Sequence, residues 1–298
     1  MWSEKGGLVK MSEIIQVNGQ RFFLRTWGEP KNPVLLLLHG FPEFSGAWEE
    51  LAPLLSDQFY CVAPDQRGYG QSYRPSDLES YKIHHLVSDV VGILEHIGGS
   101  AIVLGHDWGA SVAYALAMSH PTMVEKLIIM NGVHPLPFQR ALVESPEQIA
   151  ASQYIHWLRR AGSEQVLVEN DFERLRAMFS HGMNMQWLSG EKWDAYRSAW
   201  GDVEGVKAMV NWYRATGLYV PKLDEPIEPM PHMEAGEMMI QMPHLLLWGA
   251  ADTALLPQSY AGLEALAPQL KFASIPDTDH WLHHQKPEAI ADIILNWI

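Results

Sequence analysis

Short apolar runs separated by helical patterns limit this chain to one class of fold. Each run is apolar along its whole length, which is typical of a parallel strand buried on both faces of a sheet. The runs are Val34–Leu38, Tyr60–Ala63, Ala101–Leu104, Lys126–Met130 and His244–Trp248. Helical spacing of apolar residues appears over 84–97 and again over 288–297. Strands that alternate with helices predict an α/β fold with helices on both faces of a mostly parallel sheet.

The N-terminal region predicts a β-hairpin, with strands over 14–17 and 21–25 joined by the turn Asn18-Gly19. The folded pattern begins only at Ile14, so we expect residues 1–12 to be flexible and Met11 to be an alternative start. The first residues also lack the apolar core of a signal peptide.

The alternation of strands and helices stops between His134 and about Met242. Five of the twelve tryptophans fall in this block, and nine of the fourteen methionines fall between 178 and 242. Helix packing explains such residues one by one, but together they also suit an adaptable apolar pocket wall. We therefore expect a core over 1–133, a helical cap over 134–225, and the rest of the core over 226–298.

A strand-to-helix turn carries the strongest chemical signal. The apolar run Ala101–Leu104 leads into Gly105-His106-Asp107-Trp108-Gly109, and the small-residue segment 110–117 follows. Gly-x-Asp-x-Gly alone could be a helix N-cap. At the end of a buried strand it matches a nucleophile elbow, a sharp turn that exposes its central side chain, with Asp107 in place of the usual serine.

An aspartate nucleophile needs a base for a later step, and this turn predicts nucleophile, acid and base in that chain order. Asp252 follows the run 244–248, and His280 follows the apolar segment 270–275, just before the last helix. Asp279 is the weaker rival to Asp252 as the carboxylate that orients the histidine. His283 and His284 are expected at the surface, where the next helix begins.

An oxyanion hole should use two backbone N–H groups, one from the residue after the nucleophile and one from the loop after the first long strand. The first is Trp108. In the loop His39-Gly40-Phe41-Pro42-Glu43, Pro42 has no N–H, so Phe41 is the expected second donor. We also expect Pro42, His106, Trp157 and Trp281 to border the substrate pocket.

Composition excludes several classes of partner. The formal net charge of −14 and the lack of a Lys/Arg-rich block argue against nucleic acid. The longest apolar runs are too short to span a bilayer. Cys61, the only cysteine, lies in an apolar run and is expected to be a small buried hydrophobe. We therefore expect a cytoplasmic protein with no membrane partner, while the oligomeric state stays open and includes a homodimer.

Three motifs resemble those of the α/β-hydrolase-fold epoxide hydrolases of the soluble and microbial type. They are His39–Glu43, Gly105–Gly109 and Asp65-Gln66-Arg67-Gly68-Tyr69-Gly70. The resemblance covers nearly the whole chain from about residue 13. It implies a sheet of about eight strands with the cap inserted after strand six, and a detoxifying hydrolase whose partners are a small apolar epoxide and water.

That family opens the epoxide with two cap tyrosines. Asn211-Trp212-Tyr213-Arg214 matches the second tyrosine motif, and Gln153–Trp157 resembles the first, which places Tyr154 and Tyr213 in these roles. Arg159 stands where the first motif has a later glutamine. Asp107 would form an ester, and His280 with Asp252 would activate the water that hydrolyses it. This chemistry requires no cofactor and no metal, and no zinc or phosphate-loop motif stands out.

Two other functions remain open at this stage. A haloalkane or haloacetate dehalogenase would share the aspartate, base and acid, and Trp108 and His156-Trp157 are similar to halide-binding positions of such enzymes. Phe41 stands where haloalkane dehalogenases typically have Asn. Fluoroacetate-type enzymes carry arginines around the nucleophile, and Trp108, Ala110 and Ser111 depart from that pattern. A catalytically silent ligand receptor on the same fold is the alternative from another class.

Overall fold

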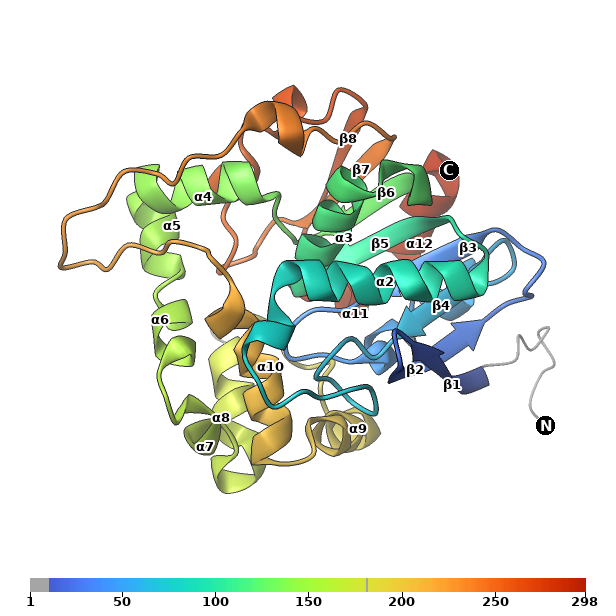
Figure 1. Cartoon of the computed structure of the whole chain (residues 1–298), viewed down its shortest axis with the longest axis horizontal. Coiled ribbons are helices and arrows are strands. Elements are labelled where there is room, and N and C mark those ends of the chain that lie inside the picture. The colour runs from blue at the N-terminus through green and yellow to red at the C-terminus, as the bar shows by residue number, and fades with distance from the viewer. Residues whose placement is uncertain (1–10, 181) are drawn as a thin grey trace.

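The computed structural model describes residues 11–180 and 182–298, and a mixed eight-stranded sheet forms its centre (Figure 1). The strand order is β1-β2-β4-β3-β5-β6-β7-β8. The six strands β3 to β8 are parallel to one another. At the other edge of the sheet, β2 is antiparallel both to β1 and to β4. The strands are β1 (Met11–Val17), β2 (Gln20–Trp27), β3 (Val34–Leu38), β4 (Tyr60–Pro64), β5 (Ala101–His106), β6 (Val124–Met130), β7 (His244–Gly249) and β8 (Leu270–Ile275). The predicted mostly parallel sheet is confirmed.

The N-terminal hairpin forms as the Asn-Gly signal predicts. Asn18 and Gly19 both have positive φ angles, of 53° and 73°, as a two-residue hairpin turn requires. Residues 1–10 lie outside the described part of the chain, so their flexibility stays a prediction. Met11 and Ser12, which that prediction also included, pair with Thr26 and Arg25 in the sheet.

Helices cover both faces of the sheet, as the unbroken apolar runs predict. Alternate residues of one strand face opposite ways: Leu36 and Leu38 join the core on one face, and Leu35 and Leu37 join the core on the other. The helices α2 (Ile83–Ile97) and α3 (Trp108–Ser119) lie on the first face, whereas α1 (Ala52–Leu55) and α12 (Pro287–Trp297) lie on the second (Figure 1). The short α11 (Leu282–Gln285) precedes α12.

A helical insertion follows β6, as expected, and lies beyond the strand ends (Figure 1). It comprises α4 (Pro135–Glu144), α5 (Pro146–Ala151), α6 (Tyr154–Arg159), α7 (Ser163–Leu167), α8 (Glu169–Phe179), α9 (Gly190–Trp200) and α10 (Val203–Ala215). Tryptophans of this cap hydrogen-bond to the core. Trp200 Nε1 donates to the carbonyl of Pro42 at 2.5 Å, and Trp212 Nε1 donates to that of Arg67 at 3.0 Å. These bonds set the cap over the carboxyl ends of the strands, where parallel sheets place their ligands.

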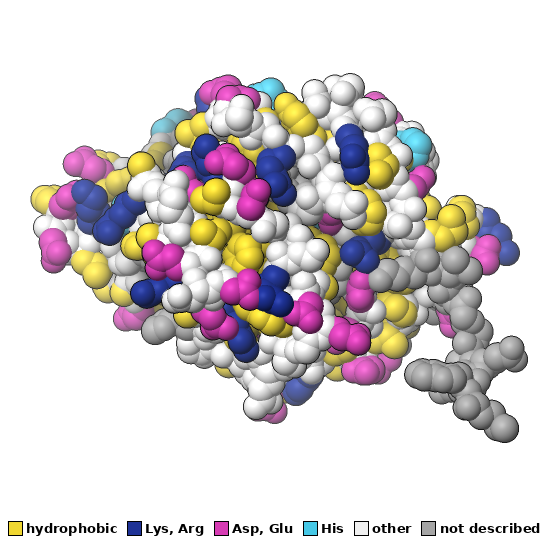
Figure 2. Space-filling view, turned by 90° about the horizontal axis from the view of Figure 1, so that it is seen from below, with side chains coloured by type: hydrophobic (Ala, Val, Ile, Leu, Met, Phe, Trp, Pro, Cys, Tyr) yellow, Lys and Arg dark blue, Asp and Glu magenta, His cyan; other side chains and the backbone are white. Residues whose placement is uncertain are grey.

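Acidic and basic side chains mix over the face of the molecule seen in Figure 2. Within the described residues, no helix is long and apolar enough to cross a membrane. Cys61 is fully buried in the core, and burial raises the pKa of its thiol to about 12, so it behaves as the predicted small hydrophobe.

Candidate active site

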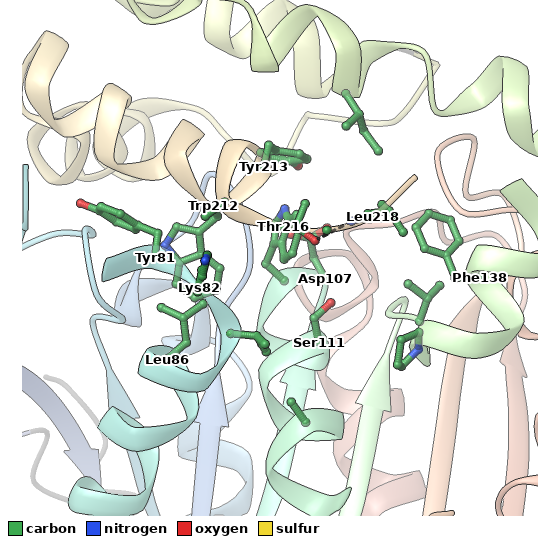
Figure 3. Close-up of a pocket in the computed structure, with 18 of the residues that line it drawn as sticks. Tyr81, Lys82, Leu86, Asp107, Ser111, Phe138, Trp212, Tyr213, Thr216 and Leu218 are labelled. Carbon is green, nitrogen blue, oxygen red and sulfur yellow. Dashed lines mark hydrogen bonds between the residues drawn. The ribbon is translucent and has the colours of Figure 1, made fainter. Parts of the chain in front are cut away.

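Asp107 lies in a tight turn between β5 and α3, with φ 51° and ψ −121°. Close packing makes glycine necessary on both sides of it. A Cβ on Gly105 would come within 2.6 Å of the carbonyl oxygen of Gly109, and one on Gly109 would collide with the backbone of Leu38 and His39. The turn directs the Asp107 carboxylate into a cavity under the cap, where Tyr213 lies above it (Figure 3).

The structure brings His280 between two carboxylates from different loops. Its Nδ1 lies 2.8 Å from Oδ2 of Asp252, and its Nε2 lies 3.6 Å from Oδ2 of Asp107. Asp252 follows β7, and His280 follows β8. Asp107 follows β5, so the three residues meet at the carboxyl ends of β5, β7 and β8, along one edge of the sheet, as their chain order predicts.

Asp252 is held in place by more partners than the sequence indicates. Its Oδ1 accepts hydrogen bonds from the backbone N–H groups of Ala254 and Leu255, at 2.8 and 2.9 Å. Its Oδ2 accepts a third bond, of 2.7 Å, from Nδ2 of Asn131. The sequence analysis missed Asn131. Its position directly after β6, at the same sheet edge as Asp107, is the signal that could have identified it.

Asp279 does not serve as the partner of His280. Its Oδ1 accepts from the backbone N–H of Trp281 at 2.9 Å and from Nε2 of Gln285 at 2.8 Å. Its Oδ2 accepts from the N–H of Asn184 at 2.6 Å. Asp279 thus shapes the loop that carries the histidine, and Asp252 is the carboxylate that orients the ring.

Burial and the neighbouring carboxylates shift the pKa of His280 in opposite directions. Burial favours the neutral ring, but the charge of Asp252 and the contact with Asp107 raise the pKa of His280 well above its ordinary value. Burial would likewise raise the pKa of Asp252, but the charge and hydrogen bond of His280 outweigh it and lower that pKa. The pair is therefore held as carboxylate and imidazolium while Asp107 is negatively charged.

The expected oxyanion-hole residues flank Asp107. The backbone N–H of Phe41 donates to Oδ1 of Asp107 at 2.7 Å. Trp108 is the first residue of α3, so its N–H has no partner within the helix. One N–H donor already contacts the carboxylate, and a second stands at the helix start beside it.

The two cap tyrosines lie over Asp107 and face each other, with ring centroids 6.1 Å apart and planes 77° apart. Tyr154 begins α6 and Tyr213 lies in α10; both line the cavities that contain Asp107. Burial, and then the charge of Asp107, raises the pKa of Tyr154. Burial, the other phenol and Asp107 raise the pKa of Tyr213. Both hydroxyls therefore keep their protons and can donate them.

Arg159, which replaces the glutamine of the family motif, links the two tyrosine-bearing helices. Its Nε donates to the carbonyl of Tyr213 at 2.9 Å, and its Nη2 donates to that of Leu218 at 2.8 Å. The sequence analysis treated this position as a departure from the motif. The structure gives it a positioning contact that a sequence pattern does not reveal.

Two mostly apolar cavities, of about 590 and 690 Å³, meet at Asp107, Tyr154, Tyr213 and Leu255. In Figure 3, which shows the first, Tyr81, Lys82, Leu86 and Trp212 lie on one side of Asp107, and Phe138 and Leu218 lie on the other. The second extends past Phe41, His280 and Trp281. Each cavity is large enough for a small organic substrate.

The remaining predicted pocket residues divide into two groups. Trp281 lines the second cavity. Among the described residues that line either cavity, Pro42, His106 and Trp157 do not appear, and neither does His156. The His106 ring is fully buried behind the turn, where its Nε2 donates to the backbone carbonyl of His280 at 2.9 Å. A polar residue beside a nucleophile can support the loop without touching the pocket.

The prediction that His283 and His284 are surface residues is wrong. They are 0% and 7% exposed. Their short helix α11 is covered by other elements: the Trp187 ring stacks on His284 at 3.8 Å, and the Trp48 ring lies 5.2 Å from His283. The sequence showed where a helix begins but not that the cap closes over it.

Comparison with known proteins agrees with this architecture. A family model described as the alpha/beta hydrolase fold matches residues 33–287. The chain is 32% identical to the AB hydrolase superfamily protein YfhM of Bacillus subtilis, over 96% of this chain and 97% of that protein. It is 30% identical to epoxide hydrolase A of Mycobacterium tuberculosis, over 96% of each.

A solved structure of an epoxide hydrolase has the same fold as this chain. It is a mutant epoxide hydrolase from Bacillus megaterium bound to its product, a naphthyloxy-propanediol, with 30% identity and a TM-score of 0.86. The match covers 96% of this chain and 99% of that one. The family model matches most of the chain, and the relatives share its architecture over nearly their whole length. The chain therefore belongs to the α/β-hydrolase fold family, in the group that contains the epoxide hydrolases.

Proposed function

We propose that this protein is an epoxide hydrolase that converts epoxides to vicinal diols through an ester on Asp107. The observation that carries the proposal is the convergence of one carboxylate and two phenols at the point where two mostly apolar cavities meet. The carboxylate suits attack on carbon, and the phenols suit protonation of the oxygen that leaves. The relatives named as epoxide hydrolases, at about 30% identity, support the same reaction.

In the first step, the Asp107 carboxylate attacks one carbon of the epoxide ring. A carbon–oxygen bond forms as the ring bond breaks, and the electron pair goes to the epoxide oxygen. Free alkoxide is too basic to leave readily, so Tyr154 and Tyr213 hydrogen-bond to this oxygen and supply a proton. The raised pKa values of both phenols fit donors that stay protonated until the ring opens.

In the second step, His280 removes a proton from water, and the resulting hydroxide attacks the carbonyl carbon of the Asp107 ester. Nε2 of His280 lies 3.6 Å from Oδ2 of Asp107, so the base stands beside the bond to be broken. The N–H of Phe41, already 2.7 Å from Oδ1, and that of Trp108 stabilise the oxyanion. The tetrahedral intermediate then expels the diol oxygen, which takes the proton held by His280. The proton of the resulting Asp107 carboxylic acid returns through solvent to the phenol that gave its own, so the carboxylate and both phenols are restored.

Aspartate is better suited than serine to this chemistry. A serine alkylated by an epoxide would become an ether, which water does not cleave readily, whereas aspartate gives an ester that a base and an oxyanion hole can hydrolyse. The phenols favour epoxides over haloalkanes as substrates, because a halide leaves as a stable anion and needs no proton. The absence of His156 and Trp157 from the described cavity linings further disfavours dehalogenation.

Replacing His280 with Gln should separate the two steps. The imidazole is not a base in the attack by Asp107, so the ester should form and then persist. Intact-protein mass spectrometry after incubation with a simple epoxide should show a mass gain equal to that epoxide, located on the peptide that contains Asp107.

Asp107→Ala is the control for this experiment and should neither turn over nor gain mass. An inactive His280→Gln protein that folds but never accumulates the adduct would show that the histidine has another role. Diol formation by Asp107→Ala at even a tenth of the wild-type rate would exclude Asp107 as the nucleophile.

The second step should depend on pH through His280. The pKa of this ring is raised in part by Asp107, whose charge disappears in the ester, so the pKa should be lower in the ester than in the free enzyme. Hydrolysis needs the neutral ring and should therefore slow as pH falls through that lower pKa. Single-turnover decay of the ester across pH gives its value, and NMR titration of His280 gives the free-enzyme value.

Asp107→Ala provides a matched control because it removes the same charge permanently. NMR should show a lower pKa for His280 in this variant than in wild type. An ester decay that is independent of pH, or a midpoint at or above the free-enzyme pKa, would contradict the assignment of His280 as the base.

Tyr154→Phe and Tyr213→Phe should each slow ester formation roughly ten- to several-hundred-fold, and the double variant should be essentially inactive. Each phenol partly replaces the other, so the single losses should be smaller than the double loss. Single-turnover kinetics on an epoxide should separate this step from ester hydrolysis, which should change much less. Tyr219→Phe, which alters a cap tyrosine outside the described cavity linings, is the control.

The same assay should include styrene-type and aliphatic epoxides, haloalkanes and fluoroacetate, with diol and halide measured in parallel. Diol from at least one epoxide is the expected result. Halide release with no reaction on any epoxide, or wild-type alkylation by the double tyrosine variant, would overturn the proposed function.

A further inference from the structure

A buried carboxylate surrounded by imidazole nitrogens lies behind the candidate active site. Oε2 of Glu43 lies 3.0 Å from Nδ1 of His106. Its Oε1 lies 3.3 Å from Nε2 of His283 and 2.8 Å from Nε2 of His284. All four side chains are closed off from solvent. The proposed reaction uses none of them.

The hydrogen-bonding requirements of His106 are not met by a neutral ring. Its Nε2 faces the carbonyl of His280, which can only accept, so this nitrogen carries a proton. A neutral ring would then direct the lone pair of Nδ1 at the Glu43 carboxylate. His284 differs, because its Nε2 can donate to Glu43 while Nζ of Lys192 lies 3.5 Å from its Nδ1 and can donate to it. The arrangement therefore calls for additional positive charge beside Glu43.

We propose that Glu43, His106 and His283 form a binding site for one divalent transition-metal ion, with zinc as the expected ion. One ligand atom from each residue lies within 4.8 Å of the other two. Two imidazoles and a carboxylate suit zinc, whereas calcium and magnesium prefer an all-oxygen set. His284 is adjacent and can supply a fourth nitrogen.

The spacing is compatible with such an ion after small movements. In a tetrahedral site with bonds of about 2.0–2.1 Å, neighbouring ligand atoms are about 3.3 Å apart. The contacts of Glu43 with the three rings, at 2.8 to 3.3 Å, are close to that value. The ligand nitrogens of His106 and His283 lie within 4.8 Å of each other, so these two rings would move toward each other when the ion binds.

Neighbouring groups provide the outer support that metal ligands usually have. His106 is oriented by its bond to the His280 carbonyl, and Oε1 of Glu43 accepts a 2.8 Å hydrogen bond from the hydroxyl of Tyr196 in α9. Such contacts fix the orientation of a ligating ring or carboxylate and strengthen binding. Tyr196 also connects the site to the cap.

The ion would act on structure rather than on the reaction. Neither His106 nor His283 is among the described residues that line the cavities, so the ion would not touch a substrate. Glu43 lies two residues after Phe41, His106 directly precedes Asp107, and His283 lies three residues after His280. One ion would thus tie together the three loops that carry the oxyanion donor, the nucleophile and the base. No local motif reveals it, because the ligands come from distant parts of the sequence.

Metal binding to the full-length protein tests this proposal independently of the enzyme's activity. After treatment with a chelator, the protein should be titrated with zinc against a chromophoric competitor, and with cobalt(II) to record the absorption of its coordination sphere. The expected results are one zinc per chain, a cobalt spectrum typical of tetrahedral nitrogen and oxygen ligands, and a higher Tm with zinc. His283→Gln should weaken zinc binding at least about 100-fold, since loss of a supporting contact alone costs 10- to 100-fold.

His232→Gln is the matched control, because it disrupts an exposed His232–Glu234 pair that could bind zinc adventitiously. It should leave the affinity and the stoichiometry unchanged. Absence of saturable one-to-one binding by wild type would overturn the proposal. Equal affinity in His283→Gln would overturn it as well.

If His283→Gln does not fold, wild-type crystals soaked in zinc decide the question by anomalous scattering. A peak between Glu43, His106 and His283 supports the site. A peak only elsewhere, or none, overturns it.

Discussion

The backbone of Asp107 is the constraint on which the rest of the site depends. A φ of 51° with ψ −121° is a sparsely populated conformation for a residue with a side chain, and it costs on the order of 1–3 kcal/mol. The packing around it keeps it in place. The strand β5 is buried between β3 and β6, α3 begins at the next residue, and glycines at 105 and 109 allow the two elements to approach closely. A rigid core thus holds a strained turn, and the carboxylate faces the cavity.

The same rigidity extends to Asp252, the carboxylate that contacts the His280 ring. Asp252 is fully buried, yet three hydrogen-bond donors besides His280 contact its two oxygens. An ionised group in a low-dielectric interior is stable only when it is compensated in this way. Its support comes from the loop after β7 and from Asn131 after β6, so the orientation of His280 depends on two strand ends. The parallel sheet brings these ends to one edge.

Features set by local pattern could be predicted from the sequence, and features set by distant contacts could not. The strands, the hairpin turn and the sharp strand-to-helix turn at Asp107 follow from the residues that form them, and the order of Asp107, Asp252 and His280 follows from the strand order. Asn131 and Arg159 were missed because their partners, Asp252 and Tyr213, lie far away in the sequence. His283 and His284 were misplaced for the same reason, since cap and core residues from distant segments bury them.

In the proposed mechanism, the loss of negative charge from Asp107 affects both the tyrosines that act as acids and the histidine that acts as the base. The negative charge of Asp107 raises the pKa of Tyr154, of Tyr213 and of His280. When Asp107 attacks, this charge passes to the epoxide oxygen beneath the two phenols. Once its ring bond breaks, this oxygen is a far stronger base than the carboxylate, so it takes the proton from a phenol that Asp107 could not deprotonate. His280 loses one of the two carboxylates that favoured its protonated form, and so it becomes a stronger candidate for the base of the next step. A single carboxylate at the meeting point of core and cap can therefore time the two half-reactions, which explains why acid and base can share one small cavity without neutralising each other.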